Sequence, residues 1–356
     1  MTPKQGSKSK SRAFTLIELA AVIAVAGTVT ASLAPMARKA RVSARVQASA
    51  SNLSAIGQGA GMYGVDNADR IPGYSLAGPT TQALRLNLPN GDRVTIRNGV
   101  DATAFQNTEI LQRRTGRLDG PFEILYDNTR LWHRRWSHVV LIDYLDSPFA
   151  DGLFIDPADA NQLTWAANPL DYGAGSTVPY ANISDGWSRE SVRQRWAFAA
   201  SYQTTVSAWN PDGIRESSYV PFSDTPHLFL VNDVPGNRLR LSDGREFAEV
   251  RYPSNKVYFF EEFDREQPGD PYFGYYHARP EKLMFDGSVN SLASGDANPS
   301  WNAANGKLKW RQRYVPLDTF PTELPGREGE RLSQRYRWTL GGLSGVDYPT
   351  VIGTSR

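Results

Sequence analysis

The stretch SRAFTLIELAAVIAVAGTVTASLAPMARKAR, residues 11–41, decides how this chain begins. From Phe14 to Ala34 the only ionisable side chain is that of Glu18. As an α-helix rising about 1.5 Å per residue, this run would be about 30 Å long, which is enough to cross the apolar core of a bilayer. The sequence therefore predicts a membrane-spanning helix with a carboxylate in its first turns.

Three explanations of this segment treat Glu18 differently. A plain membrane anchor leaves the carboxylate without a partner, and such a group in an apolar layer costs roughly 2.5 kcal/mol or more. An ordinary secretory signal peptide accounts for the small residues 32–34, but it places Glu18 in the apolar region and Pro35 directly after the cut. The third explanation gives Glu18 a cationic partner from another subunit, because two buried charges are tolerated as a pair.

The segment RAFTLIEL, residues 12–19, resembles the type IV prepilin signature. In that family an inner-membrane peptidase removes a basic leader before a Phe and methylates the new N-terminal amine. The resemblance implies cleavage between Ala13 and Phe14, methylation of Phe14, and a role for Glu18 in assembly through the amine of a neighbouring subunit. The family has Gly before the cut, whereas this chain has Ala13.

The leader accounts for the slight basicity of the chain. The whole sequence has 39 basic and 37 acidic residues, and residues 1–13 contribute four of the basic ones and no acid, so the mature chain is formally −2. This balance argues against a nucleic-acid binder. Basic residues also follow the apolar run, so the positive-inside rule does not decide orientation, and the prepilin resemblance implies a cytoplasmic N-terminus. The chain has no cysteine, which excludes disulfides, thiol catalysis and Cys-ligated zinc.

A long helix is predicted to continue beyond the apolar run. Pro35 interrupts the backbone hydrogen bonding of a helix, and in the resembling family a proline at this position kinks one long helix, which is the role we expect here. The helix should stop near Gly64–Asp69, where Gly, Asp and Asn accumulate, after about 50 residues. Its second half should form a stem against a head, because apolar residues recur there at helical spacing: Val42, Val46, Leu53, Ile56, Ala60 and Tyr63.

The remainder of the chain predicts an α+β head with a mainly antiparallel sheet and long loops. Residues 156–189 are expected to form ordered loops, and residues 90–93 and 242–246 to form hairpin turns. The predicted organisation is therefore a leader at 1–13, a transmembrane and stem helix at 14–66, and a globular head at 67–356. The predicted strands are residues 92–98, 138–145, 227–231, 249–252 and 255–262.

Five motifs occur in order along the head: WSHVVLIDYL (136–145), FIDPAD (154–159), AASYQTT (199–205), YPSNKVYFFEE (252–262) and HARPEKLMFDGSV (277–289). In this order they resemble the landmarks of a group of bacterial pseudopilins related to the major pseudopilin of type II secretion. Two departures are visible: Asp156 stands where that group has Cys, and Ser288 where it has His, so neither a thiol nor a histidine-pair metal site is expected.

Candidate chemistry in the head is sparse. The acidic pair Glu261 and Glu262 has no accompanying nucleophile and base, so no catalytic activity is expected. The loop after residue 285 holds Asp286, Asn290 and Asp296, whose oxygens would suit calcium, and the resembling pseudopilins hold calcium in this region. The alternative is that Asp286 and Gly287 form a β-turn, with no cofactor. Four histidines lack metal-ligand spacing: His133, His138, His227 and His277.

These observations predict a structural subunit of a pseudopilus or type IV pilus-like filament of the type II secretion kind. The resemblance implies an inner-membrane protein with a single span, a cytoplasmic N-terminus and a periplasmic head, which later forms a periplasmic or surface filament. Its partners would be copies of itself or other pseudopilins, the prepilin peptidase and an inner-membrane assembly platform, with no requirement for nucleic acid. The alternative is an exported envelope protein that binds or hydrolyses carbohydrate and has an ordinary signal peptide.

Overall fold

The computed structural model describes most of the chain after the leader. The chain divides into two compact units, Met1–Arg45 and Val46–Arg356. Helix α1 (Leu16–Asp66) contributes residues to both units. The leader, Ala13 and Phe14 lie outside the described residues. Those residues are 15–74, 82–96, 99–116, 136–145, 152–167, 198–209, 219–221, 229–231, 244–266, 269–302, 307–314, 327 and 329–349.

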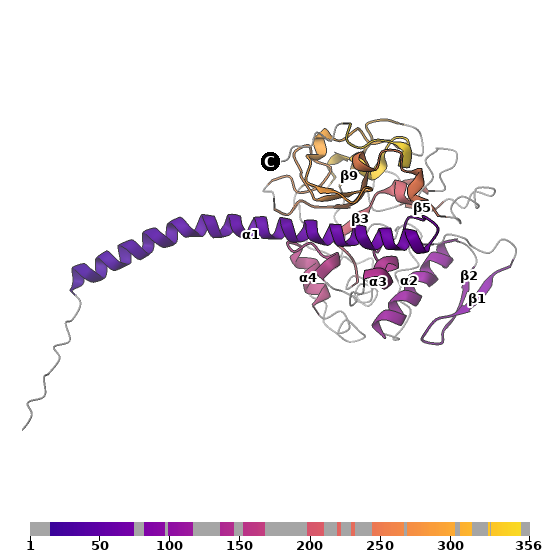
Figure 1. Cartoon of the computed structure of the whole chain (residues 1–356), viewed down its shortest axis with the longest axis horizontal. Coiled ribbons are helices and arrows are strands. Elements are labelled where there is room, and N and C mark those ends of the chain that lie inside the picture. Colours follow the sequence, from indigo (N-terminus) through magenta and orange to yellow (C-terminus); the bar gives the residue numbers. More distant parts are fainter. Residues whose placement is uncertain are drawn as a thin grey trace, which may run out of the picture. The chain divides into compact units, whose positions relative to one another are not determined.

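Helix α1 runs from Leu16 to Asp66, a length of 51 residues, and it continues through Pro35 (Figure 1). The predicted single helix of about 50 residues is confirmed, as is its end. Two left-handed residues terminate it, Ala68 (φ 55°) and Asp69 (φ 65°), and the Asp69 N–H donates to Gly64 O at 2.8 Å. This is the hydrogen bonding by which helix ends satisfy their last carbonyl groups.

A four-stranded antiparallel sheet forms the centre of the second unit. Its strands are β3 (Tyr202–Thr204), β6 (Val257–Glu261), β7 (Lys282–Met284) and β8 (Val289–Asn290), in the order β3-β6-β7-β8. Every residue of β6, sequence VYFFE, is buried, as expected of a central strand rich in β-branched and aromatic side chains.

Three antiparallel pairs, three further α-helices and eight 3₁₀ turns complete the described elements. The pairs are β1 (Leu84–Asn87) with β2 (Arg93–Ile96), β4 (Tyr219–Pro221) with β5 (Phe229–Val231), and β9 (Arg311–Arg313) with β10 (Arg331–Ser333). The helices are α2 (Gly99–Thr115), α3 (Ile142–Leu145) and α4 (Ala160–Ala166). Short 3₁₀ turns are η2 (Val139–Leu141), η3 (Gly152–Phe154), η4 (Val206–Ala208), η5 (Phe247–Glu249), η6 (Pro253–Asn255), η7 (Ser294–Asp296), η8 (Arg335–Trp338) and η9 (Gly342–Ser344).

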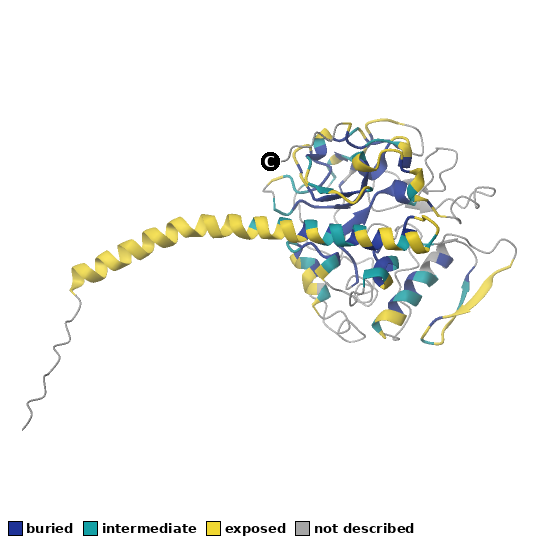
Figure 2. Cartoon of the chain, viewed as in Figure 1, coloured by how far each residue is buried: buried dark blue, intermediate teal, exposed yellow. Residues whose placement is uncertain are grey.

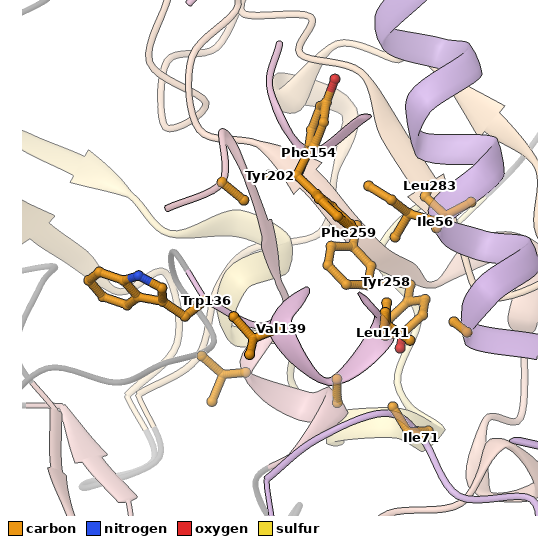
Figure 3. Close-up of a cluster of buried hydrophobic side chains, with 14 of the residues drawn as sticks. Ile56, Ile71, Trp136, Val139, Leu141, Phe154, Tyr202, Tyr258, Phe259 and Leu283 are labelled. Carbon is orange, nitrogen blue, oxygen red and sulfur yellow. The ribbon is translucent and has the colours of Figure 1, made fainter. Parts of the chain in front are cut away.

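Two hydrophobic clusters lie within the second unit. The first joins the stem part of α1 to the sheet, and Ile56, Tyr258, Phe259 and Leu283 belong to it (Figure 3). Strand β6 contributes to both clusters through a break in register between Val257 and Phe259. Because this irregularity interrupts the alternation of side chains, consecutive Tyr258 and Phe259 both join the first cluster, whereas Val257 and Phe260 join the second.

The strand predictions were correct at three places and wrong at two. Strands β2, β5 and β6 confirm the predictions for residues 92–98, 227–231 and 255–262, apart from residues 97, 98, 227 and 228, which lie outside the described residues. The hairpin turn at 90–93 joins β1 to β2. Residues 138–145 are instead η2 followed by α3, because a short apolar run that is buried fits a helix as well as a strand.

The other differences have local causes. Residues 249–252 form no strand, since η5 ends at Glu249 and η6 begins at Pro253. The part of the expected 242–246 hairpin that is described, from Gly244 onward, leads into η5 and not into a strand. Helix α4 lies inside the predicted loop at 156–189, where Asp159 caps it by accepting a hydrogen bond from Gln162 N. Helix α2 was not predicted.

Candidate functional site

The first turn of α1 is organised by Thr15 and Glu18. Glu18 Oε2 accepts hydrogen bonds from Thr15 N at 2.8 Å and Thr15 Oγ1 at 2.9 Å, and Glu18 N approaches Thr15 Oγ1 at 3.3 Å. This reciprocal pattern is a capping box, which satisfies N–H groups that a helix start leaves without partners. The sequence Thr-Leu-Ile-Glu was the available signal for this role, which we did not predict.

The capping box uses only one oxygen of the carboxylate. Glu18 Oε2 receives both donors from Thr15, and Oε1 receives none from the residues that the structure describes. The side chain is exposed at the end of an apolar helix. Glu18 can therefore cap its own helix and still accept a cation through Oε1. The amine that the prepilin resemblance assigns to this role would belong to Phe14, which lies outside the described residues.

The first half of α1 presents apolar side chains to its surroundings. All residues from Thr15 to Arg41 are exposed (Figure 2). Its hydroxyl groups are satisfied within the helix, since Thr28, Thr30 and Ser32 each donate to the carbonyl four residues earlier at 2.8–2.9 Å. A helix in an apolar medium needs this internal satisfaction of polar groups. By length and composition α1 can span a membrane, and a signal sequence meets the same criteria.

The predicted kink at Pro35 and the predicted calcium site stay predictions. Asp286 lies in the turn between β7 and β8, and its Oδ1 accepts from Ser288 N at 2.9 Å and Ser288 Oγ at 2.6 Å. The β-turn interpretation is confirmed, with Gly287 at φ 85°. Asn290 Oδ1 accepts from Leu292 N, and Asp296 lies in η7. Within the described ranges, no three His, Asp or Glu side chains are grouped so as to hold a metal ion.

The described histidines differ in exposure. His138 is buried, with its ring centroid 4.4 Å from that of Phe154, and burial lowers the pKa of its imidazole to about 3. It is therefore neutral at physiological pH and serves the core. His277 is exposed, and His133 and His227 lie outside the described residues.

A buried polar group joins the stem of α1 to the sheet. Ser49 Oγ on α1 donates to Glu261 Oε1 on β6 and lies 3.0 Å from the hydroxyl of Tyr202 on β3. Asn52, one turn further along, donates through Nδ2 to Gly152 O at 3.0 Å. These bonds fix the rotation of α1 about its axis relative to the sheet, because they reach only one face of the helix.

Asp156 takes part in a buried ion pair beside this group. Arg265 binds Asp156 Oδ2 at 3.0 Å and Asp159 Oδ2 at 2.8 Å, and Ser201 Oγ donates to Asp159 at 2.8 Å. The Asp-Pro-Ala-Asp segment thus anchors its turn through charge. We did not predict Arg265, because the pairing joins segments far apart in the sequence.

Glu281 should make the stability of the head depend on pH. Burial raises the pKa of its carboxyl to about 7, so the folded state holds a proton that the unfolded chain releases near pH 4.5. The resulting stabilisation is complete below about pH 4.5 and is lost as the pH rises to about 7. The free energy of unfolding should therefore fall between pH 4.5 and pH 7 in the unmodified chain. In Glu281→Gln we expect this fall to be smaller by up to about 3 kcal/mol.

Denaturant unfolding of the full chain in detergent micelles, at pH values between 4.5 and 8, measures this effect. The exposed carboxylate of Glu246 offers a matched control, and Glu246→Gln should keep the pH dependence of the unmodified chain. Equal pH dependence in Glu281→Gln and the unmodified chain would contradict the assignment.

Comparisons with protein-family models, with curated proteins and with solved structures find no match to this chain. The structure has a long apolar N-terminal helix whose second half packs on a small antiparallel sheet, which is compatible with a pilin-like fold. The resemblance to pseudopilins consists of the match of residues 12–19 to the prepilin signature and of the ordered landmarks of the head.

Proposed function

We propose that this chain is a structural subunit of a pseudopilus or type IV pilus-like filament of the type II secretion kind. The observation that carries the proposal is the start of α1, where Glu18 stands beside Thr15 in the first turn of a helix whose first half is apolar and exposed. Cleavage before Phe14 would place the new amine within one turn of this carboxylate.

The energetics of the exposed helix support assembly. A large contiguous apolar surface on a protein marks contact with lipid or with another protein, and membrane lipid can cover α1 before assembly. Glu18 has no equivalent partner in lipid, and its exposed Oε1 costs energy there unless a cation binds it. The terminal amine of a neighbouring subunit removes that cost and sets the axial register of the two helices, because a pair of this kind tolerates little displacement.

The remaining roles follow from this assignment. The prepilin peptidase and an inner-membrane platform are the partners during processing and assembly, and copies of this chain or related pseudopilins are the partners in the filament. The head works in the periplasm as a packing and display module without catalysis or a required cofactor. The competing function is that of an exported envelope protein acting on or binding carbohydrate, since a signal sequence near the N-terminus meets the same criteria of length and composition.

Mass spectrometry of the mature N-terminus distinguishes these functions. We expect a chain that begins at N-methylated Phe14, and Ala13→Gly should be processed at least as completely because it restores the family's small residue. Ala13→Arg, with a large cation at the cleavage site, is the negative control. A mature chain that begins at Pro35 would refute the filament assignment and support ordinary export.

A further inference from the structure

The antiparallel pair β9–β10 has cationic residues gathered at one of its ends. Arg311 on β9 lies opposite Ser333 on β10. This register places Lys309 and Arg335, each two residues beyond that pair, at the same end of the two strands. Lys309 and Arg311 are exposed, and Arg335 is half-buried. We use the term cationic end for four residues: Lys309, Arg311, Ser333 and Arg335.

The backbone is strained at two positions of the cationic end. Lys309 has φ 56° and Arg335 has φ 41°, in the left-handed region that residues other than glycine rarely adopt. Among the described residues, the other two of this kind are Ala68 and Asp69, which terminate helix α1. Lys309 and Arg335 do not end an α-helix. Strain of this sort persists where the surrounding structure enforces it, and it is concentrated at functional sites.

The guanidinium of Arg335 has few partners for its hydrogen-bond donors. Nη1 donates to Ala297 O at the long distance of 3.5 Å, and Nε is buried without a hydrogen-bond partner. Nε and Nη2 form the edge of a guanidinium that binds two oxygens of a carboxylate, phosphate or sulfate side by side. Because a buried donor without a partner costs free energy, an oxyanion at this edge would stabilise the side chain.

The charges around Arg335 also favour an anion. Burial lowers the pKa of its guanidinium, and the positive charge of Arg311 lowers that pKa further. Asp296 is exposed and makes no ion pair with either arginine, nor does any other carboxylate of the described residues. The sequence has no acidic residue at 297–317 or at 331–346. Two cations held close together without a carboxylate give a positive potential that attracts anions.

An exposed aromatic ring lies beside Arg335. Tyr276 is 58% exposed, and the guanidinium carbon of Arg335 is 5.9 Å from its ring centroid. Gly295 packs closely against this ring, since a Cβ on Gly295 would lie 2.6 Å from Tyr276. The ring is therefore held in place and offers an apolar surface next to the cations. Most of it is open to water, which suits a sugar, because a sugar that packs there keeps its hydroxyl groups hydrated.

We propose that the cationic end of β9–β10 binds a phosphate or sulfate group carried by a sugar. The oxyanion bonds across Nε and Nη2 of Arg335, and Arg311 and Lys309 supply further positive charge. The hydroxyl of Ser333 donates to it, and the sugar ring packs on Tyr276. Three cations suit one anionic group, whereas a polyanion such as nucleic acid needs a longer basic surface. The proposal does not rest on the filament function.

Titration calorimetry of the full chain in a nonionic detergent tests the site with glucose 6-phosphate, inorganic phosphate and glucose. We expect glucose 6-phosphate to bind about threefold more tightly than inorganic phosphate, because only the sugar contacts Tyr276, and glucose not to bind. Tyr276→Ala should remove this difference and keep the affinity for phosphate. Equal affinities for the two phosphates in the unmodified chain would overturn the sugar contact. Binding of neither phosphate would overturn the site.

Arg335→Gly separates a binding role from a structural one. Glycine adopts the left-handed backbone without strain, so the melting temperature should stay equal or rise. The affinity for glucose 6-phosphate should fall at least about tenfold, because charged hydrogen bonds are lost. A lower melting temperature would show that Arg335 is needed for the fold and would overturn the proposal.

Arg251→Gln is the matched control for these measurements. Arg251 is exposed and lies 5.5 Å from the ring centroid of Tyr252, which is 43% exposed, but its backbone is not left-handed. This variant should bind glucose 6-phosphate as the unmodified chain does. An equal loss in Arg251→Gln and Arg335→Gly would show that binding follows the total charge, and it would overturn the assigned site.

A single-stranded DNA of about ten nucleotides tests the competing ligand class. We expect it to bind no more tightly than glucose 6-phosphate. Tighter binding that weakens steeply with salt would overturn the sugar assignment and indicate a nucleic-acid surface.

Discussion

Glu18→Val should reduce incorporation into filaments by about 100-fold or more while leaving membrane insertion intact. Valine suits the apolar helix, but it removes the carboxylate that the proposed assembly contact offers to the terminal amine of a neighbouring subunit. Removing one member of a buried ion pair typically costs about 3–5 kcal/mol, because the other charge stays in an apolar environment. Quantifying subunits in sheared filaments against subunits in the membrane, in cells that also process Phe14, measures the ratio.

The capping box makes Glu18→Gln the decisive control. Glutamine at this position can still accept from the N–H and hydroxyl of Thr15, so it preserves the helix start seen in the structure. It lacks the charge needed to pair with an ammonium group. We expect Glu18→Gln to be defective in assembly like Glu18→Val. Normal assembly of the Gln variant would show that Glu18 serves only to cap its own helix and would refute the intersubunit ion pair.

Arg337→Met should strongly destabilise the head, lowering the free energy of unfolding by about 3–5 kcal/mol. Arg337 is 1% exposed, and its guanidinium lies 4.4 Å from the ring centroid of Phe273. Nη2 donates to Glu262 Oε1 at 3.2 Å and to Gln203 Oε1 at 3.0 Å. Nη1 donates to Gln334 Oε1 at 2.9 Å. Methionine fills part of this space but removes the positive charge beside a carboxylate that is also 1% exposed.

Denaturant unfolding of the full chain in detergent micelles measures this loss. Arg331→Met, at an exposed position on β10, should change the free energy of unfolding by no more than about 0.5 kcal/mol. Adding Glu262→Leu to Arg337→Met should recover most of the loss, because replacing both members of a buried pair with apolar residues is often nearly neutral. A loss below about 1 kcal/mol in Arg337→Met would contradict the assigned role.

Local patterns predicted the parts of this protein that depend on residues close together in sequence. The length and end of α1 followed from one uninterrupted apolar run, a helical stripe and the glycine-rich segment at its C-terminus. The prediction of strand β6 followed from its run of valine and aromatic residues. The prediction of the turn between β1 and β2 followed from the Asn-Gly pair. The same approach failed for residues 138–145, whose apolar run is short and buried and has no period to distinguish helix from strand.

The candidate functional residues also differ in whether local sequence was enough to find them. Glu18 stood out because a charge in an apolar run is costly wherever the chain folds, and the Thr15 contact that the structure adds involves a residue only one turn away. By contrast, the partners of Asp156, Glu261 and Arg337 are distant in sequence. Sequence shows that these side chains can be charged, but not which polar or charged group folding brings within hydrogen-bond distance.

The sequence alone thus established an apolar N-terminal helix with one carboxylate, a stem and an α+β head, because helix period and the cost of an isolated charge are local properties. Tertiary structure decided that Gly57 and Gly64 pack against the head while Gly61 is left facing an open groove. It also decided which buried charges are paired. Those features depend on distances between segments that are far apart along the chain, and such distances are set only when the stem packs on the sheet.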